Sequence, residues 1–171
     1  MRMLIVGLLI VTGGAALAQH HQEHKQSPYT DMQSRAIKAL SEQQVADLKA
    51  GRGMGLALAA ELNGYPGPLH VLELADVIEL SDRQRELVKG LYEAMKQQAI
   101  AAGQKLIDAE AALDRAFRER VITADRLAEL TRAVGVAQAE LRAVHLGYHL
   151  TTAELLDAGQ TKRYAELRGY R

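Results

Sequence analysis

Apolar residues recur every three or four positions along most of this chain, which is the spacing of amphipathic helices. The longest run extends from Asp82 to about Glu119, and its apolar positions are Leu87, Leu91, Met95, Ala99, Ala102, Leu106, Ala109, Leu113 and Ala116. A second run, from about Ala124 to Leu150, alternates steps of three and four through Leu127, Leu130, Val134, Ala137, Leu141, Val144 and Tyr148. Only a short break at 120–123 separates them, so we expect a long antiparallel helical hairpin.

Shorter helices are predicted around this hairpin. One follows Ser41 and runs to about Ala50, after which Gly51, Gly53 and Gly55 interrupt the helical pattern. The others are a helix-prone stretch at 54–62, a helix at 69–80 that Pro68 can start, and a last helix from Asp157 to about Gly169. Inside the long helices, glycines either allow close helix approach or bend the helix; they are Gly90, Gly103, Gly135 and Gly147. We expect no strands, and therefore an all-α fold.

Three helix starts share one pattern: a leucine, a capping residue, two variable positions and a glutamine. The copies are Leu40-Ser41 with Gln44, Leu80-Ser81 with Gln84, and Leu156-Asp157 with Gln160. The Ser or Asp side chain can accept a hydrogen bond from a first-turn backbone N–H, which has no partner inside the helix. The glutamine can accept one from the N–H of the capping residue. We therefore expect a capping box at each copy.

The first 18 residues have the pattern of a secretory signal peptide. Arg2 is followed by an uncharged run from Met3 to Ala18, and Ala16-Leu17-Ala18 is a small-residue cleavage site. The run is shorter than the roughly 20 apolar residues of a membrane span; a retained anchor is the alternative. The chain has no Cys, which excludes a lipid-anchored lipoprotein and disulfides. We expect cleavage after Ala18 and a periplasmic protein.

Composition and charge limit what the rest can be. Residues 19–39 are polar and rich in His and Gln, so we expect a disordered tail before a helical domain at 40–171. The 21 basic and 21 acidic residues balance, which excludes the basic excess that nucleic-acid binding needs. Trp is absent and Phe117 is the only Phe, so large core residues are few. A homodimer would bury more surface.

Two groups of histidines are candidate metal ligands. His20, His21 and His24 lie next to the predicted mature N-terminus, where His21 would be the third residue. A free amine, two amides and that imidazole suit square-planar Cu(II) or Ni(II); a solvated polar tail is the alternative.

The second group is His145 and His149, which share one side of a helix and can bind one transition metal. The seam through Val144 and Tyr148 places this pair on its flank, which favours a surface or interface position over full burial. His70 and Glu73, also on one helical face, are candidate additional ligands for Cu(II), Zn(II) or Ni(II). No cofactor is required by any of these patterns.

Sequence signals for enzymatic chemistry are absent. The chain has no cysteine nucleophile, no G-x-S-x-G, no phosphate loop and no H-E-x-x-H. Carboxylates are plentiful, but their spacing beside Lys and Arg is typical of solvated helical faces. We expect that the protein is not an enzyme.

The leader, the cysteine-free hairpin and the repeated helix start together resemble the Spy/CpxP/ZraP family of periplasmic proteins, whose mark is L-T-x-x-Q. The residues that carry the resemblance bracket the hairpin: Leu80, Ser81, Gln84, Leu156, Asp157 and Gln160, with Ser and Asp in place of Thr. The resemblance implies an all-α homodimer, curved into a cradle, that shields unfolding proteins without ATP. It also implies roles in stress-sensor attenuation and in zinc- or copper-linked chaperoning.

These patterns favour a periplasmic, ATP-independent, chaperone-like protein of the envelope-stress type that can respond to metal. Its partners would be unfolded or misfolded envelope proteins, or a membrane sensor protein. The alternatives are a heavy-metal (Cu, Zn or Ni) sensor or resistance protein, and a structural dimer that docks on a membrane sensor. Apolar residues outside the main seams either contact clients or form ordinary core; they are Met54, Leu56, Leu58, Leu62, Val71, Leu74 and Ile78.

Overall fold

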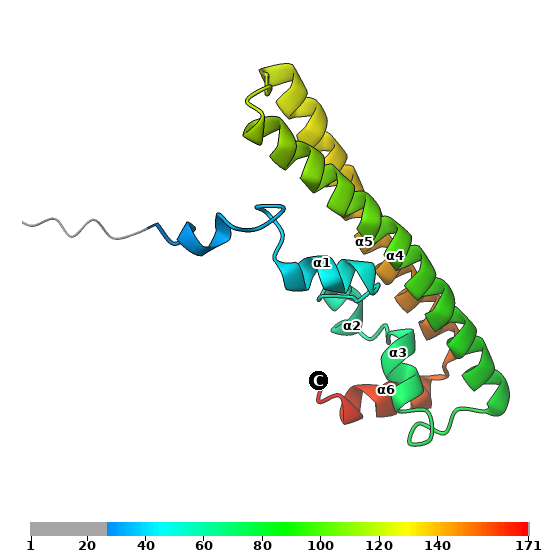
Figure 1. The fold of residues 1–171 in the computed structure, drawn as a ribbon. Helices are drawn as coiled ribbons and strands as arrows, with labels where there is room; N and C mark the ends of the chain where they lie inside the picture. Colours follow the sequence, from blue (N-terminus) through cyan, green and yellow to red (C-terminus); the bar gives the residue numbers. More distant parts are fainter. Residues whose placement is uncertain (1–26, 171) are drawn as a thin grey trace, which may run out of the picture. The chain divides into compact units, whose positions relative to one another are not determined.

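The computed structural model describes residues 27–170, and all of its α-helices lie in the compact unit formed by residues 31–171 (Figure 1). After one 3-10 turn at Thr30–Met32, the helices are α1 (Glu42–Lys49), α2 (Leu58–Glu61), α3 (Pro68–Glu73), α4 (Asp82–Arg118), α5 (Ala124–Leu155) and α6 (Ala158–Leu167). The described residues contain no strand, which confirms the all-α fold. The predicted leader and the histidines at 20, 21 and 24 lie outside the described residues.

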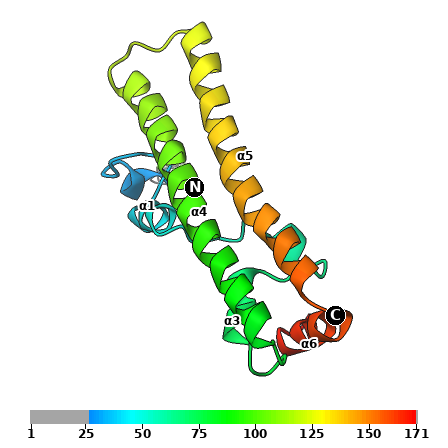
Figure 2. The ribbon, with the colours of Figure 1, turned by 90° about the vertical axis from the view of Figure 1, so that its right-hand side faces the viewer.

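Helices α4 and α5 form the predicted antiparallel hairpin and lie side by side along their length (Figure 2). Two contacts show the antiparallel register: the Gln98 side chain donates to the Tyr148 hydroxyl at 2.8 Å, and Lys105 pairs with Glu140 at 2.9 Å. The Thr123 hydroxyl caps α5, as predicted, by accepting from the N–H of Arg126. Helix α5 continues to Leu155, five residues beyond the predicted end.

The hairpin seam differs from the predicted one in both helices. Leu87 was expected inside and is 44% exposed, whereas the next residue, Val88, is fully buried. In α5, Leu141 is buried as expected, but the buried line then continues through His145 and His149. A helix with 3.6 residues per turn drifts away from a strict seven-residue repeat, and a second layer of chain covers the flank that this drift exposes.

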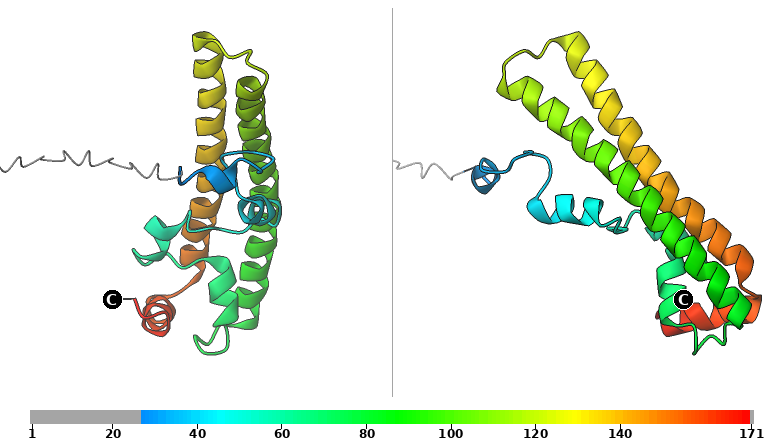
Figure 3. Two further views of the ribbon diagram at one scale, coloured as in Figure 1. Left: turned by 60° about the vertical axis from the view of Figure 1, so that its left-hand side comes forward. Right: turned by 45° about the vertical axis from the view of Figure 1, so that its right-hand side comes forward.

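That second layer consists of α1, α2, α3 and their loops, which lie with α6 on one side of the hairpin (Figures 1 and 3). Two of its helices are shorter than predicted, because α2 is a single turn and α3 ends at Glu73 in a series of turns that reach Glu79. Pro68 is the first residue of α3, as predicted. None of the described helices combines the length and apolar content that a membrane span requires.

Two apolar clusters hold the layers together. The first joins α1 to the middle of the hairpin: Leu48, Ala99, Ala102, Leu106, Ile107, Ala137 and Leu141. The second joins α3 and α6 to the start of α4: Val71, Ala75, Ile78, Leu80, Val88 and Tyr164. Ile37 packs against the first cluster, and the Lys38 N–H donates to Asp114 at 3.3 Å. The packed part of the chain therefore begins inside the segment 19–39 that was predicted to be a tail.

Gly103 is the residue that allows α1 to approach the hairpin so closely. A Cβ at this position would lie 2.7 Å from the carbonyl oxygen of Leu48. At Gly90, Gly135 and Gly147 a Cβ would meet nothing within 4 Å. Of the two roles proposed for the helical glycines, close approach is therefore confirmed at Gly103.

All three capping boxes are confirmed. Each capping side chain accepts from the backbone N–H of its glutamine, and each glutamine side chain accepts from the N–H of its capping residue; the pairs are Ser41–Gln44, Ser81–Gln84 and Asp157–Gln160.

The glutamines of the second and third copies also meet each other across the fold. Nε2 of Gln84 donates to Oε1 of Gln160 at 2.8 Å, and Nε2 of Gln160 donates back at 3.1 Å. Gln84 donates in addition to the carbonyl oxygen of Leu155 at 2.8 Å. In the described part of the chain, the side-chain hydrogen bond of Gln44 stays within its own helix start. Two copies of the motif therefore join the start of α4 to the α5–α6 junction.

We predict that Gly103→Ala lowers the free energy of unfolding by about 1–3 kcal/mol, because the new methyl group must displace a backbone carbonyl of α1. Gly90→Ala is the matched control. It fills open space on the same helix and should raise the unfolding free energy by about 0.5–1 kcal/mol through helix propensity alone. Urea unfolding followed by circular dichroism measures both; equal effects in the two variants would contradict the close approach.

We predict that Gln84→Ala and Gln160→Ala each lower the unfolding free energy by about 1–2 kcal/mol, since each removes the reciprocal bond of a capping box and a bond across the fold. The double variant should lose at least about 0.5 kcal/mol less than the two single losses together, because the residues are in contact. Gln44→Ala, which removes only the reciprocal bond of its capping box, should cost about 0.5–1 kcal/mol. Strict additivity of Gln84→Ala and Gln160→Ala would show that the amide pair contributes nothing.

Candidate functional site

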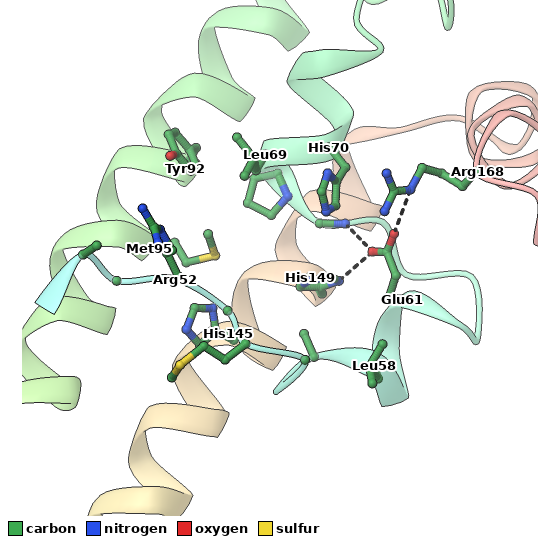
Figure 4. A pocket seen from close by; sticks show the side chains of 18 of the residues that line it. Arg52, Leu58, Glu61, Leu69, His70, Tyr92, Met95, His145, His149 and Arg168 are labelled. Atoms are coloured by element: carbon green, nitrogen blue, oxygen red, sulfur yellow. Dashed lines mark hydrogen bonds and ion pairs between the residues drawn. The ribbon is translucent and has the colours of Figure 1, made fainter. Parts of the chain in front are cut away.

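A cavity of about 450 Å³ lies between the second layer and the hairpin (Figure 4). Its walls come from the loop 50–57, from α2, from the start of α3, and from the faces of α4 and α5 that this loop covers. Arg168 and Tyr170, which follow α6, close one side. The loop bends away from α1 because Gly51 and Gly55 adopt positive φ angles of 68° and 78°, a conformation that glycine adopts without steric cost.

His145 lies on the wall of this cavity and is only 2% exposed. The expectation of a surface or interface position is therefore wrong for this residue, because Gly53 of the covering loop lies over the imidazole: a Cβ there would be 3.8 Å from Nδ1. Nε2 of His145 is buried and has no hydrogen-bond partner. Burial, and to a lesser degree the neighbouring His149, lowers the pKa of His145, so its imidazole is neutral at pH 7.

His149, one turn further along α5, is 8% exposed, so the surface expectation is wrong here as well. Its Nδ1 donates to the carbonyl oxygen of Tyr65 at 2.7 Å, which fixes the proton on Nδ1 because a carbonyl only accepts. The ring lies against Gly67, where a Cβ would come within 2.7 Å of Nε2. The turn at 63–68 thus covers the second histidine as the loop 50–57 covers the first.

Glu61 is the residue of this candidate site that the sequence patterns missed. Its carboxylate is buried at the end of α2 and accepts hydrogen bonds from the hydroxyls of Tyr164 and Tyr170 and from the N–H of Gly67. Nδ1 of His149 lies 3.6 Å from its second oxygen, and Nε of Arg168 lies 3.7 Å from its first (Figure 4).

The contacts of Glu61 change the pKa of Tyr164, and the position of Glu61 is also recognisable in the sequence. Burial and the hydrogen bond to Glu61 raise the pKa of Tyr164, which therefore stays protonated as a donor. Glu61 is also the only Asp, Glu, Lys or Arg between residues 53 and 69. A single charged residue in an otherwise uncharged stretch was the sequence signal that could have identified Glu61 as a buried site residue.

Within residues 27–170, His70 and Glu73 do not complete a metal site with His145 and His149. His70 lines the cavity, but its Nδ1 lies 2.8 Å from a carboxylate oxygen of Glu73 on the exposed surface of α3. Among the described residues, no three or more His, Cys, Asp or Glu side chains are grouped so that they could hold a metal ion. The imidazoles of His145 and His149 would supply two ligands, which is fewer than structural zinc sites use.

The apolar candidates divide into core and surface. Val71 and Ile78 are fully buried, and Leu56 and Leu74 are half-buried against the two core clusters. The other three remain exposed, together with two further residues of the same segment. We call this set the 54–69 apolar surface; its side chains are between 38% and 57% exposed, and they are Met54, Leu58, Leu62, Tyr65 and Leu69.

Comparison of the chain with protein-family models, with curated proteins and with solved structures gives no match.

We predict that Glu61→Gln lowers the unfolding free energy by about 2–3 kcal/mol, because it removes a charged acceptor that several buried or half-buried donors share. Glu73→Gln is the control, since Glu73 is exposed and pairs with the partly exposed His70, and should change stability by less than about 0.5 kcal/mol. Urea denaturation provides the measurement. A loss for Glu61→Gln no larger than that of the control would show that this carboxylate does not anchor α2.

Proposed function

We propose that this protein is an ATP-independent, chaperone-like protein of the cell envelope that holds unfolded or misfolded proteins on the 54–69 apolar surface. The observation that carries the proposal is the exposure of five large apolar side chains on one short segment. Soluble proteins rarely leave such side chains clustered in contact with water unless they bind a partner there.

The physical character of this surface suits loose binding of unfolded chains. Its apolar side chains are only partly exposed, so each contact with a client is weak and reversible. Two charged side chains border the same cavity as Leu58 and Leu69: Arg52, whose side chain is 64% exposed, and Arg168. Charges at the edge of an interface accelerate encounter, while the modest apolar area sets how long the complex lasts.

The segment is also held in place, which is what a binding surface requires. The Glu61 network anchors α2 to the C-terminal residues, and His149 anchors the following turn at Tyr65. Binding therefore does not have to order this part of the chain, and less affinity is lost to conformational entropy.

The resemblance to the Spy/CpxP/ZraP family supports the same function. The capping boxes at Ser81 and Asp157 are formed, and they bracket a long helical hairpin in a chain without strands in its described part. A periplasmic location and a homodimer are part of this proposal, as is a membrane sensor protein as an alternative partner.

The main alternative is a metal-binding sensor or resistance protein. The observation that favours it is the buried, unpartnered Nε2 of His145 next to a second imidazole. In this alternative, metal binding comes first and any protection of clients is secondary.

We predict that the wild-type protein, at near-equimolar amounts and without nucleotide or metal, suppresses the light scattering of reductively denatured α-lactalbumin. Leu58→Glu/Leu62→Glu should reduce this suppression at least about fivefold, because two charges then occupy the apolar surface. The control, Val136→Glu/Leu150→Glu, adds the same charge at positions of α5 that are about equally exposed, and should remain active.

Inactive wild-type protein, or equal losses in both double variants, would contradict the chaperone proposal. Calorimetric titration with Cu(II) and Zn(II) distinguishes the chaperone from the metal-binding sensor or resistance protein. Metal binding that His145→Ala/His149→Ala abolishes, in a protein that fails to protect the client, would favour the sensor.

A further inference from the structure

We propose that the cavity beneath the 54–69 apolar surface is a binding site for a small amphiphilic anion, namely a carboxylate with an aliphatic tail. The inference concerns the interior of the cavity and does not depend on chaperone activity, because binding is measured without any client protein. Four properties of the cavity carry it: an imidazole in its wall, an excess of hydrogen-bond donors, apolar walls, and a glycine in the covering loop.

The imidazole in the wall is the first property. The ring of His145 borders the cavity from α5 (Figure 4). Its Nδ1–Cε1 edge faces Gly53 of the covering loop, whereas Nε2 is closed off from solvent. A polar group of a ligand in the cavity would therefore meet the imidazole at its Nδ1 edge.

The excess of donors is the second property, and it selects the head group. Arg52, Arg168 and Tyr92 line the cavity, and an arginine carries five N–H donors in a fork that matches a carboxylate. The hydrogen bonds of Arg52 to Asp47 and of Arg168 to Tyr170, with the ion pair of Arg168 and Glu61, use only part of this capacity.

The acidic group in the cavity wall already has hydrogen-bond partners within the protein. Glu61 is its only Asp or Glu side chain, and both of its oxygens accept from protein donors. A cationic ligand would therefore meet a carboxylate that already accepts from protein donors, whereas a ligand carboxylate would meet N–H groups of the two arginines and the hydroxyl of Tyr92. The donor excess thus favours an anion over a cation of the same size.

The apolar character of the walls and the volume of the cavity indicate what kind of tail the ligand carries. Leu58, Leu69 and Met95 line the cavity, as does Met54, and methionine side chains adapt readily to the shape of a flexible ligand. A volume of about 450 Å³ lies within the range of about 300–1,000 Å³ that is typical of small-molecule sites. An unbranched aliphatic tail fits this combination of size and adaptable apolar walls.

Gly53 provides a direct test, because it lies over His145 without requiring glycine for its own conformation. Its φ angle is not in the left-handed region, and a Cβ would meet His145 at an ordinary distance of 3.8 Å. Gly53→Leu should therefore fill the cavity in front of His145 without straining the backbone. Gly135→Leu is the matched control, since Gly135 faces open space on the same helix as His145.

The experiment uses three amphiphiles with the same ten-carbon tail, each below its micelle concentration: decanoate, decanol and decyltrimethylammonium. Isothermal titration calorimetry of the wild-type chain should show 1:1 binding of decanoate, with decyltrimethylammonium at least tenfold weaker and decanol between the two. Gly53→Leu should weaken decanoate binding at least tenfold, and Gly135→Leu should leave it unchanged. Equal binding of the three amphiphiles, or decanoate binding that Gly53→Leu does not weaken, would overturn the inference.

A second measurement keeps the test valid if Gly53→Leu folds poorly. In ¹H–¹³C spectra of the wild-type protein, the Hε1 resonance of His145, assigned with His145→Phe, should shift as decanoate is added. An unmoved His145 resonance at saturating decanoate would overturn the inference by itself. Client protection by a protein that does not bind decanoate would leave the chaperone proposal intact, so the two proposals fail separately.

Discussion

The buried carboxylate of Glu61 is the interaction on which the arrangement of this molecule depends most. It joins α2 to the turn that carries Gly67 and to Tyr164 and Tyr170 near the end of the chain. These two tyrosines follow Glu61 by 103 and 109 residues. Without such an acceptor, the single turn of α2 would have little to hold it, because a four-residue helix has almost no intrinsic stability. The same carboxylate lies in the wall of the cavity between the second layer and the hairpin.

The repeated helix start has a second use that its capping chemistry alone does not reveal. Each copy stabilises the helix that follows it, but Gln84 and Gln160 also bond to each other and so close the base of the hairpin. One amide side chain can do both because its oxygen accepts from the cap while its nitrogen is free to donate elsewhere. The Gln44 copy caps α1 in the same way and has no partner copy among the described residues.

The exposed apolar side chains and one wall of the cavity belong to the same segment, and they have a common physical origin. Residues 53–69 contain glycines, prolines and small apolar residues and only one Asp, Glu, Lys or Arg. Such a segment cannot cover all of its apolar side chains by folding on itself. Leu58 and Leu69 are therefore partly exposed and at the same time line the cavity.

Local patterns in the sequence were sufficient for the hairpin, the caps, Pro68 at the start of α3 and the all-α fold, because helix periodicity and capping act over a few residues. They failed where distant segments decide the outcome. His145 and His149 are buried because the second layer covers their side of α5, and Glu61 is satisfied by residues at the far end of the chain. Periodicity places a residue on a face of its own helix, but only the tertiary structure determines what covers that face.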